Sequence, residues 1–254
     1  MFNIVGKKTI HIFQVIGGLT ITLGQALKSI VKGEFNFSNT IDQMIFLGLN
    51  SFFIIVLTAG FVGMVFTVQI IKDLTRAGGA SLLGGVVGIA IWRELGPVMA
   101  AIVIAGRVGA AISAELGTMK VTEQIDALKS MATEPIDYLV TPRILAILIM
   151  LPLLAGIADI VGFFGGYTVA VFMHKISSTA FLDSAQKWCE VWDIFGGLIK
   201  AACFGVLIAG ISCYFGLRAE KGAKGVGEVT TKAVVYSLMA IFISNYFLAL
   251  IIFG

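Results

Sequence analysis

Five long segments of the sequence are almost free of charged residues, and this feature limits what the chain can fold into more than any other. They are residues 44–71, 77–92 with 95–106, 144–173, 201–217 and 233–253. A helix needs about 20 apolar residues to cross a membrane, so the first, third and last segments are long enough as they stand. The fourth is long enough if residues 194–199 are included and Lys200 extends its ammonium group to the membrane surface. The sequence therefore predicts five transmembrane helices.

The composition agrees with a membrane protein and argues against other classes. Of all residues 13% are charged and 58% are hydrophobic, whereas about a quarter are charged in soluble domains. The formal net charge of +3 is too small to indicate nucleic-acid binding. Cys189, Cys203 and Cys213 form no CxxC pair, so neither a disulfide framework nor a metal site is expected. We predict an all-α integral membrane protein.

The second apolar segment is too long for a simple crossing. A continuous helix over residues 77–112 would measure about 54 Å, against a hydrocarbon core of about 30 Å. Proline removes a helical N–H and clashes with the preceding turn, so we expect this helix to project from the membrane, to break near Gly96-Pro97, or to do both.

The N-terminal region differs from the rest. Residues 9–31 are apolar on balance but carry polar side chains throughout, with lysines near both ends. This pattern favours an amphipathic helix lying in the headgroup region, and a sixth span is the alternative. We therefore divide the chain into an N-terminal interfacial helix region, residues 1–43, and a transmembrane domain, residues 44–254.

The distribution of basic residues predicts the orientation. With the N-terminus inside, the inner segments hold Lys7, Lys8, Lys28, Lys32, Lys120, Lys129, Arg143, Arg218, Lys221, Lys224 and Lys232. The outer segments hold Lys72, Arg76, Lys175 and Lys187. Because inner loops are richer in Lys and Arg, this predicts a cytoplasmic N-terminus and a periplasmic C-terminus.

The loop between the second and third spans, residues 117–143, contains a predicted short helix. Thr122 is a candidate N-cap, and Glu123 and Asp126 fall in the first turns, where the helix dipole favours anions. Ile125 and Leu128 lie on one apolar edge. Such a helix at the inner surface either docks a soluble partner or is a solvated connector.

The chain contains no nucleotide-binding motif. G-x-x-x-x-G-K-[ST] does not occur, and the "GAKGVG" of residues 222–227 follows an apolar helix rather than a strand. We therefore expect no catalytic residue and no bound cofactor in this chain. If ATP is hydrolysed, a partner hydrolyses it.

Charges inside the apolar segments need a reason. A charge at the bilayer centre costs about 2.5–3.5 kcal/mol on the insertion scale. Arg93 and Glu94 are adjacent, point about 100° apart on a helix, and so must find separate partners. They form either a polar patch beside a lipid cavity or a structural ion-pair network. For Asp159 we expect a buried hydrogen bond that fixes helix packing.

Five stretches resemble one family. They are "RELGPVMAAIVIAGRVGAAISAELGTMKVTEQIDAL" (residues 93–128), "PRILA" (142–146), "ADIVGFFGGY" (158–167), "CYFGL" (213–217) and "GAKGVGEVTTKAVV" (222–235). Together they closely resemble the MlaE (YrbE) permease family. Two positions depart from the family pattern: Asn245 stands where Asp is common, and Glu134 precedes Pro135 where the family has Asp-Pro.

The resemblance implies the membrane subunit of an ABC transporter that moves phospholipids or related lipids between membranes. It implies a homodimer in the bacterial inner membrane, two cytoplasmic ATPases that bind ATP and Mg, and a periplasmic ring of MCE-domain subunits. It also implies that residues 122–128 form the coupling helix, whose candidate contact residues are Thr122, Glu123, Gln124, Ile125, Asp126 and Leu128.

Two further sites are predicted with the family in view. Phe66, Gln69 and Ile70, with Arg93 and Glu94, should border an apolar lipid pocket that opens toward the periplasm. Small residues recur along one face of the last span, at Ala233, Ser237, Ala240 and Ser244. Such a stripe allows close helix packing, either across a two-fold dimer interface or within one subunit.

Two other functions stay open from the residues alone. An ion-coupled secondary transporter could use the intramembrane acids as a proton relay, although no inverted repeat is evident. A non-transporting membrane anchor is the other, but it would not need intramembrane charges.

Overall fold

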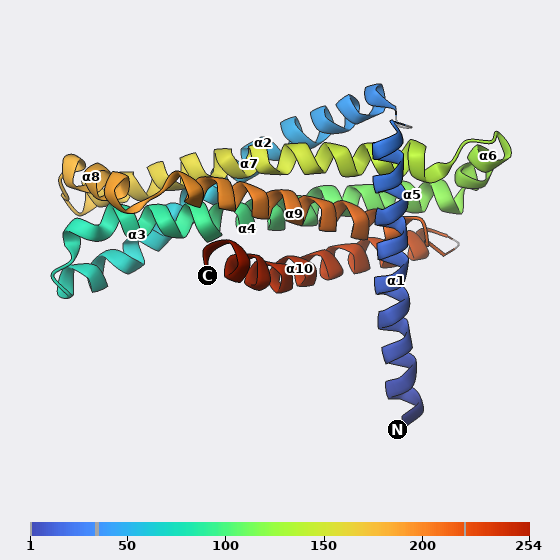
Figure 1. The fold of residues 1–254 in the computed structure, drawn as a ribbon, viewed down its shortest axis with the longest axis horizontal. Coiled ribbons are helices and arrows are strands. Elements are labelled where there is room, and N and C mark those ends of the chain that lie inside the picture. Colours follow the sequence, from blue (N-terminus) through green and yellow to red (C-terminus); the bar gives the residue numbers. More distant parts are fainter. Residues whose placement is uncertain (1, 34–35, 221) are drawn as a thin grey trace. The chain divides into compact units, whose positions relative to one another are not determined.

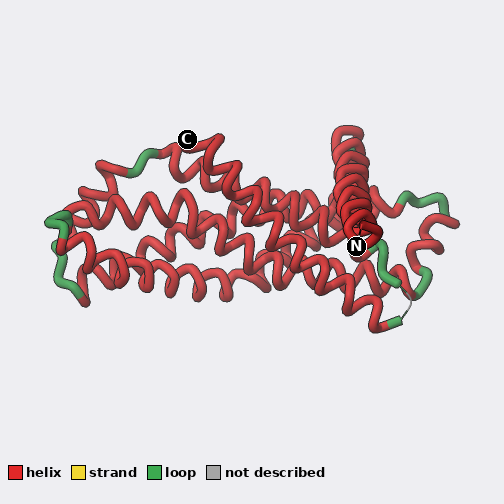
Figure 2. Tube along the Cα trace, turned by 90° about the horizontal axis from the view of Figure 1, so that it is seen from below, coloured by secondary structure: helices red, strands yellow, loops and turns green. Residues whose placement is uncertain are grey.

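A computed structural model describes residues 2–33, 36–220 and 222–254, so Lys221, one of the residues used for the orientation, lies outside it. The described residues form helices and connecting turns without strands (Figure 2). The elements, labelled in Figure 1, are α1 Phe2–Lys32, α2 Phe37–Arg76, η1 Ala80–Leu82, α3 Leu83–Ala90, η2 Ile91–Leu95, α4 Gly96–Ile104, η3 Ala105–Gly109, α5 Ala110–Val121, α6 Gln124–Ser130, η4 Ile136–Val140, α7 Thr141–Thr168, η5 Val169–Met173, α8 Ser178–Trp188, α9 Val191–Gly216 and α10 Ala223–Phe253.

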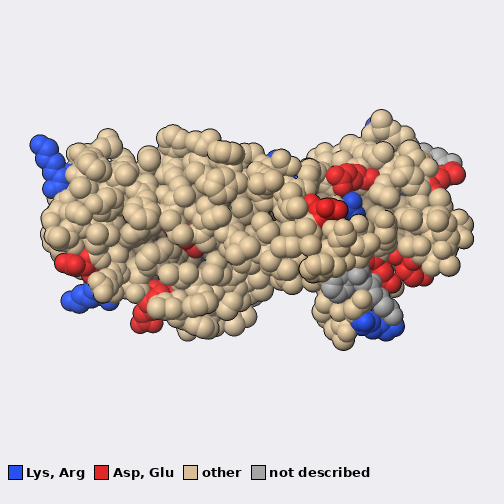
Figure 3. Space-filling model, turned by 90° about the horizontal axis from the view of Figure 1, so that it is seen from above, with Lys and Arg blue, Asp and Glu red and all other residues tan. Residues whose placement is uncertain are grey.

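The prediction of five spans is confirmed. Five helical stretches are long and apolar enough to cross a membrane: Phe37–Arg76, Ala80–Val121, Ile136–Met173, Val191–Gly216 and Ala223–Phe253. Helix α1 is not among these stretches in the described part of the chain. Broad areas of the molecular face in Figure 3 carry no Lys, Arg, Asp or Glu, as a lipid-exposed surface requires.

The helices divide into two compact units. One comprises residues 1–44, 105–147 and 206–238, and the other residues 45–104, 148–205 and 239–254. Several long helices contribute to both units.

In the first unit, α1 packs against η4 and α9. The hydroxyl of Tyr214 donates a hydrogen bond to the carbonyl of Gln14 at 3.3 Å, and the Tyr214 ring lies directly over Gly18. Arg143 pairs with Glu115 at 3.1 Å, which ties the start of α7 to α5. The predicted interfacial helix is therefore fixed to the spans by specific contacts.

In the second unit, glycines bring helix backbones into contact. Gly63 of α2 lies against Gly162 of α7, where an added Cβ would collide with the Gly162 carbonyl. Gly84 of α3 approaches the Phe181 carbonyl of α8 in the same way, and Figure 1 shows these two helices side by side. Phe181 belongs to a buried core cluster with Leu83.

The long second span bends locally instead of breaking. A π-helical segment, η2, directly precedes Gly96-Pro97, and the Gly96 N–H bonds to the carbonyl of Ile91, five residues back. Proline 97 has no N–H and crowds the preceding turn, which accounts for an irregular turn at this place. The expected break near Gly96-Pro97 is therefore a π-bulge, and the helix continues to Val121.

Candidate functional site

Arg93 and Asp193 form a short ion pair inside the second unit. The Arg93 Nε lies 2.7 Å from Asp193 Oδ1, and the Asp193 side chain is 1% exposed. The other carboxylate oxygen of Asp193 accepts a hydrogen bond from the backbone N–H of Glu190 at 2.9 Å. Asp193 therefore sits fully paired in the first turn of α9.

The neighbouring Glu94 finds different partners, as the 100° separation of adjacent helical residues predicts. Its Oε1 lies 2.9 Å from the Nζ of Lys200, whose side chain is fully buried. Its Oε2 accepts a hydrogen bond from Asn245 Nδ2 at 2.9 Å. Glu94 thus connects the second span to α9 and to α10.

Lys200 has a second role at the helix irregularity. Its Nζ donates a hydrogen bond to the backbone carbonyl of Arg93 at 2.8 Å. In a regular α-helix this carbonyl would accept from the N–H of residue 97, and proline has none. The expectation that Lys200 reaches the membrane surface is therefore wrong, because the partly exposed Glu94 carboxylate and the Arg93 carbonyl hold its ammonium group inside.

The C-terminal end of α10 covers this group of charges. The Phe253 ring centroid lies 4.8 Å from the Arg93 guanidinium carbon and 5.8 Å from Lys200 Nζ. The Trp192 indole donates a hydrogen bond to the Ile252 carbonyl at 3.3 Å. We call Arg93, Glu94, Asp193, Lys200 and Asn245 the charge network.

Of the two alternatives for Arg93 and Glu94, the geometry favours the structural ion-pair network. Asp193 and Lys200 were not predicted as its members. Their spacing of seven residues, two helical turns, places both on one face of α9 and is the sequence signal that could have found them. The basic Arg93 of the second span pairs with the acidic Asp193 of α9, and the acidic Glu94 pairs with the basic Lys200.

Only some of the residues predicted to line a lipid pocket border a cavity. An apolar cavity of about 340 Å³ is lined by Phe61, Val62, Val65, Phe66, Gln69 and Leu95. Two predicted residues, Phe66 and Gln69, are among these. Ile70 instead packs against the buried core cluster, while Arg93 and Glu94 point into the charge network. We call this cavity the α2 pocket.

The expected hydrogen bond at Asp159 is absent. Its side chain is buried, and neither carboxylate oxygen has a hydrogen-bond partner among the described residues. The carboxyl group lies against Gly96, where any side chain would collide with Asp159 Oδ1. Because glycine has no side-chain donor, the Asp159 carboxyl group fits against Gly96 but gains no hydrogen bond from it.

The short helix predicted between the second and third spans is present as α6, but it begins differently. Thr122 is not its N-cap, because the Thr122 hydroxyl bonds back to the carbonyl of Thr118 at 2.9 Å and ends α5. Glu123 precedes the helix in the left-handed conformation, with φ of 61°. Ile125 is buried and Leu128 is half-buried, so these two side chains attach α6 to the rest of its unit as predicted.

The polar edge of α6 carries some side chains that form ion pairs and others that do not. Gln124 and Glu123 are exposed, and Glu123 has no ion-pair partner among the described residues. Asp126 is paired within the chain, 3.1 Å from Lys120 and 3.5 Å from Lys129. The hydrogen bond from Lys120 is the main cause that holds the pKa of Asp126 below its usual 3.8. This pairing is present above pH 3.8 and is lost as the pH falls through the lowered value.

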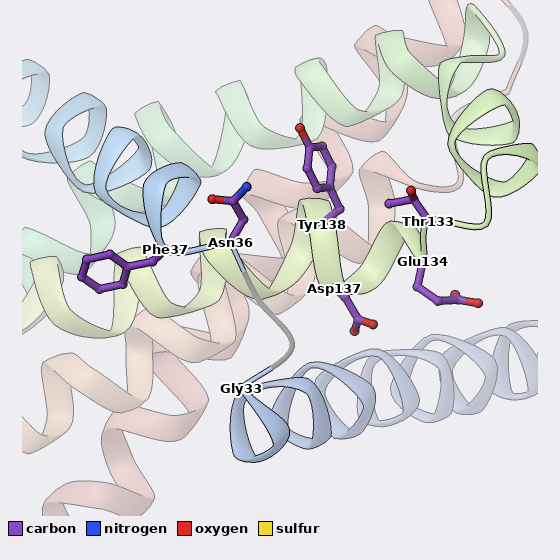
Figure 4. Close-up of a pocket in the computed structure, with 7 residues that line it drawn as sticks. All are labelled: Gly33, Asn36, Phe37, Thr133, Glu134, Asp137 and Tyr138. Atoms are coloured by element: carbon purple, nitrogen blue, oxygen red, sulfur yellow. The ribbon is translucent and has the colours of Figure 1, made fainter.

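A polar hollow lies where the α6 loop meets α1. A pocket of about 580 Å³ has Gly33, Asn36, Phe37, Thr133, Glu134, Asp137 and Tyr138 around it. Figure 4 shows Glu134 and Asp137 extending toward α1, whereas Tyr138 points away from it. A smaller adjoining pocket places Lys28 of α1 beside the same two acids. Lys28 of α1 and Asp137 of η4 therefore line the same hollow.

The small-residue stripe of α10 is largely covered by the chain itself. Ala233 and Ser237 are fully buried, and Ala240 and Ser244 are half-buried. The alternative of packing within one subunit therefore holds at Ala233 and Ser237, because small residues favour close approach of helices within a chain as well as between chains. A dimer interface stays a prediction at Ala240 and Ser244.

The described residues include no group of His, Cys, Asp and Glu that could hold a metal ion. Three features of the site stand out. They are the apolar α2 pocket, the charge network, whose Glu94 directly precedes the pocket residue Leu95, and the exposed Glu123 at the start of α6.

Comparison with known proteins agrees with this geometry. Residues 40–251 match the family model described as Permease MlaE. The chain is 48% identical to a probable ABC transporter permease of Synechocystis, covering 95% of this chain and 92% of that protein. It is 43% identical to a probable ABC transporter permease of Rickettsia typhi, covering 99% and 97%. It is also 42% identical to the chloroplastic protein Trigalactosyldiacylglycerol 1 of Arabidopsis thaliana, covering 91% and 67%. The chain is a multi-pass membrane protein that belongs to the MlaE permease family, and it is the permease subunit of an ABC transporter.

Proposed function

We propose that this permease moves phospholipids or related lipids between the inner and outer membranes of a bacterium, powered by a separate cytoplasmic ATPase. The observation that carries the proposal is the α2 pocket. Aromatic and aliphatic side chains line almost all of it, and Gln69 is its single polar side chain. A few polar groups in an apolar cavity can orient one headgroup while the walls hold acyl chains.

The charge network supports the same function. Leu95 lines the α2 pocket and directly follows Glu94 in the chain. Arg93 and Glu94 keep 34% and 41% of their side-chain surface exposed although both are paired. The network therefore fixes the second span beside the α2 pocket, whose lining includes neither Arg93 nor Glu94. The name of the Arabidopsis relative contains that of a glycerolipid, which is in keeping with a lipid substrate.

We further propose that α6 is the coupling helix and that ATP and Mg are bound by the partner ATPase. Ile125 and Leu128 fix α6 to its own unit, so a force on its exposed edge would be transmitted to the spans. The exposed Glu123 carboxylate is the group available to basic residues of a partner. The assembly would comprise two copies of this chain, two ATPases and a periplasmic MCE-domain ring, with the N-terminus cytoplasmic and the C-terminus periplasmic.

Photocrosslinking in the assembled transporter tests the lipid proposal. A photoreactive residue at Phe66 should capture lipid, and ATP turnover should change the yield, since transported lipid leaves the pocket. Phe53 is the matched control, because it lies on the same helix, is 74% exposed and does not line the pocket. It should capture bulk lipid whether or not ATP is present. Equal, ATP-independent labelling at both positions would contradict the proposal.

A second arm separates this function from ion-coupled transport. Liposomes that contain this chain alone should move no lipid under a pH gradient, while addition of the ATPase and ATP should start movement. Movement driven by the pH gradient without the ATPase would favour the proton relay.

A further inference from the structure

A larger apolar pocket lies in the second unit, and its lining shares no residue with that of the α2 pocket. Its volume is about 580 Å³, and its walls come from α7, from the start of α9 and from Trp92. Trp92 and Phe163 stack with ring centroids 5.3 Å apart, which gives the pocket one flat aromatic wall. Leu153 and Ile160 of α7 line it and are themselves more than half exposed, so the pocket opens on an apolar surface of the helix.

Asp159 is the one ionisable residue in the lining of this pocket. The residue is 2% exposed. Both of its oxygens lack a hydrogen-bond partner among the described residues, and no cation is paired with it there. A buried polar group without a partner costs free energy, so such a group in a pocket wall indicates a ligand that satisfies it.

The chemistry of the ligand follows from this lining. A hydroxyl group both donates and accepts, so it can bond to a carboxyl group in either protonation state. A phosphate would place a second anion beside the carboxyl, and a zwitterionic headgroup would bring charges for which the pocket has no further partner. The rest of the ligand must be apolar, because the remaining walls are. From Pro152 to Phe164 the lining follows α7 for about 18 Å at 1.5 Å per residue, which suits one extended hydrocarbon chain.

We propose that this pocket binds a neutral lipid alcohol, with its hydroxyl group at Asp159 and its chain along α7. Entry is from the bilayer, where such molecules dissolve. This site is distinct from the α2 pocket, and it can be occupied whether or not that pocket carries a transported lipid.

Tryptophan fluorescence of the purified full-length chain in detergent tests the proposal. The probes are 1-hexadecanol, hexadecane and hexadecyl phosphate, each brominated at mid-chain so that it quenches nearby tryptophan. The alcohol should quench at concentrations at least tenfold lower than the alkane or the phosphate. Trp92→Phe should remove the preference for the alcohol, because Trp188 and Trp192 do not line the pocket and are exposed to every probe alike.

Two substitutions decide whether Asp159 and the pocket are responsible. Asp159→Leu should abolish the tenfold preference while the alkane still quenches, and Asp159→Asn should keep the preference because an amide also bonds to a hydroxyl. Gly156 lines the pocket, and a Cβ there would sit in ordinary contact with Leu198 at 3.7 Å. Gly156→Leu should therefore fill the pocket and remove the quenching of Trp92 by every probe.

Three outcomes would overturn the proposal. They are equal quenching by alcohol and alkane, a preference that survives Asp159→Leu, and undiminished quenching in Gly156→Leu. If Asp159→Leu does not fold, Asp159→Asn and Gly156→Leu still decide the outcome. Phe66→Ala, in the α2 pocket, should leave the preference unchanged, so failure here is separable from failure of the lipid-transport proposal.

Discussion

Lys200 donates a hydrogen bond to the backbone carbonyl of Arg93 at 2.8 Å, the carbonyl that would otherwise accept from the missing N–H of Pro97. The same ammonium group is paired with Glu94 at 2.9 Å. The buried Lys200 ammonium group therefore satisfies a backbone carbonyl at the π-bulge and neutralises Glu94, which lies within the bulge. The bulge and the charge network stabilise each other.

Glu94→Gln should be more destabilising than Lys200→Met. The first leaves a fully buried ammonium group without its carboxylate, and the loss of one partner of a buried pair costs about 3 kcal/mol. Lys200→Met leaves Glu94, which is 41% exposed and can be hydrated. The double variant should lose less than the sum of the two. Unfolding of each purified variant in detergent measures this, and strictly additive losses would contradict the pairing.

Pro97→Ala should reduce the cost of removing Lys200. The alanine N–H can supply the hydrogen bond to the Arg93 carbonyl that Lys200 supplies now, and such a bond is worth about 1 kcal/mol. The destabilisation by Lys200→Met should fall by about this amount in the Pro97→Ala background. Pro152→Ala is the matched control, since Pro152 lies inside α7 and the hydrogen bond and ion pair of Lys200 go to Arg93 and Glu94 instead. An equal effect in both backgrounds would mean that the carbonyl does not depend on Lys200.

The sequence predicts the spans well because each depends on a local property. Apolar length identifies all five, and helical periodicity correctly places Ile125 and Leu128 on the buried edge of α6. The charge network is not predictable in this way. Arg93 and Asp193 are a hundred residues apart. Nothing in the sequence near Lys200 distinguishes a buried lysine from one that reaches the membrane surface.

Turn chemistry explains another error. A threonine at a helix boundary can cap the following helix or bond back to the preceding turn, and both conformations suit the same sequence. At Thr122 the backward bond to Thr118 is the one formed. Glu123 then takes the left-handed backbone conformation that separates α5 from α6. Glutamate does not favour this conformation, so the sequence gives no sign of it.

Glu123→Arg should weaken binding of the partner ATPase about tenfold, a change of about 1.4 kcal/mol. The exposed carboxylate has no partner within the described chain, so its charge is available to another subunit. Asp126→Asn is the control and should have a smaller effect, because Lys120 and Lys129 already engage this carboxylate. Copurification and lipid-stimulated ATP hydrolysis measure both variants. Normal assembly and turnover with Glu123→Arg would exclude this residue from coupling.

Gly63→Ala should destabilise the protein by about 1–3 kcal/mol, the cost of overpacking a well-packed contact. Its added Cβ would collide with the Gly162 carbonyl and force α2 away from α7. Gly106→Ala is the control, because nothing lies within 4 Å of a Cβ at that helical position. That change should be neutral or stabilise by about 0.5–1 kcal/mol. Thermal unfolding in detergent distinguishes the two, and similar shifts for both would show that α2 and α7 do not depend on this close contact.

Oxidative crosslinking in membranes tests where two copies of the chain meet. In a background without the native cysteines, a single cysteine at Ala240 or Ser244 should form a dimer if the outer half of α10 lies at a two-fold axis, since a residue there meets its own symmetry mate. A cysteine at Ser237 should not react, because that side chain is 0% exposed in the single chain. Met239 and Phe242 are 54% and 57% exposed and report on the other face of α10. Crosslinks at Met239 or Phe242, with none at Ala240 or Ser244, would show that the small-residue stripe packs within one subunit along its whole length and that the dimer forms on another surface.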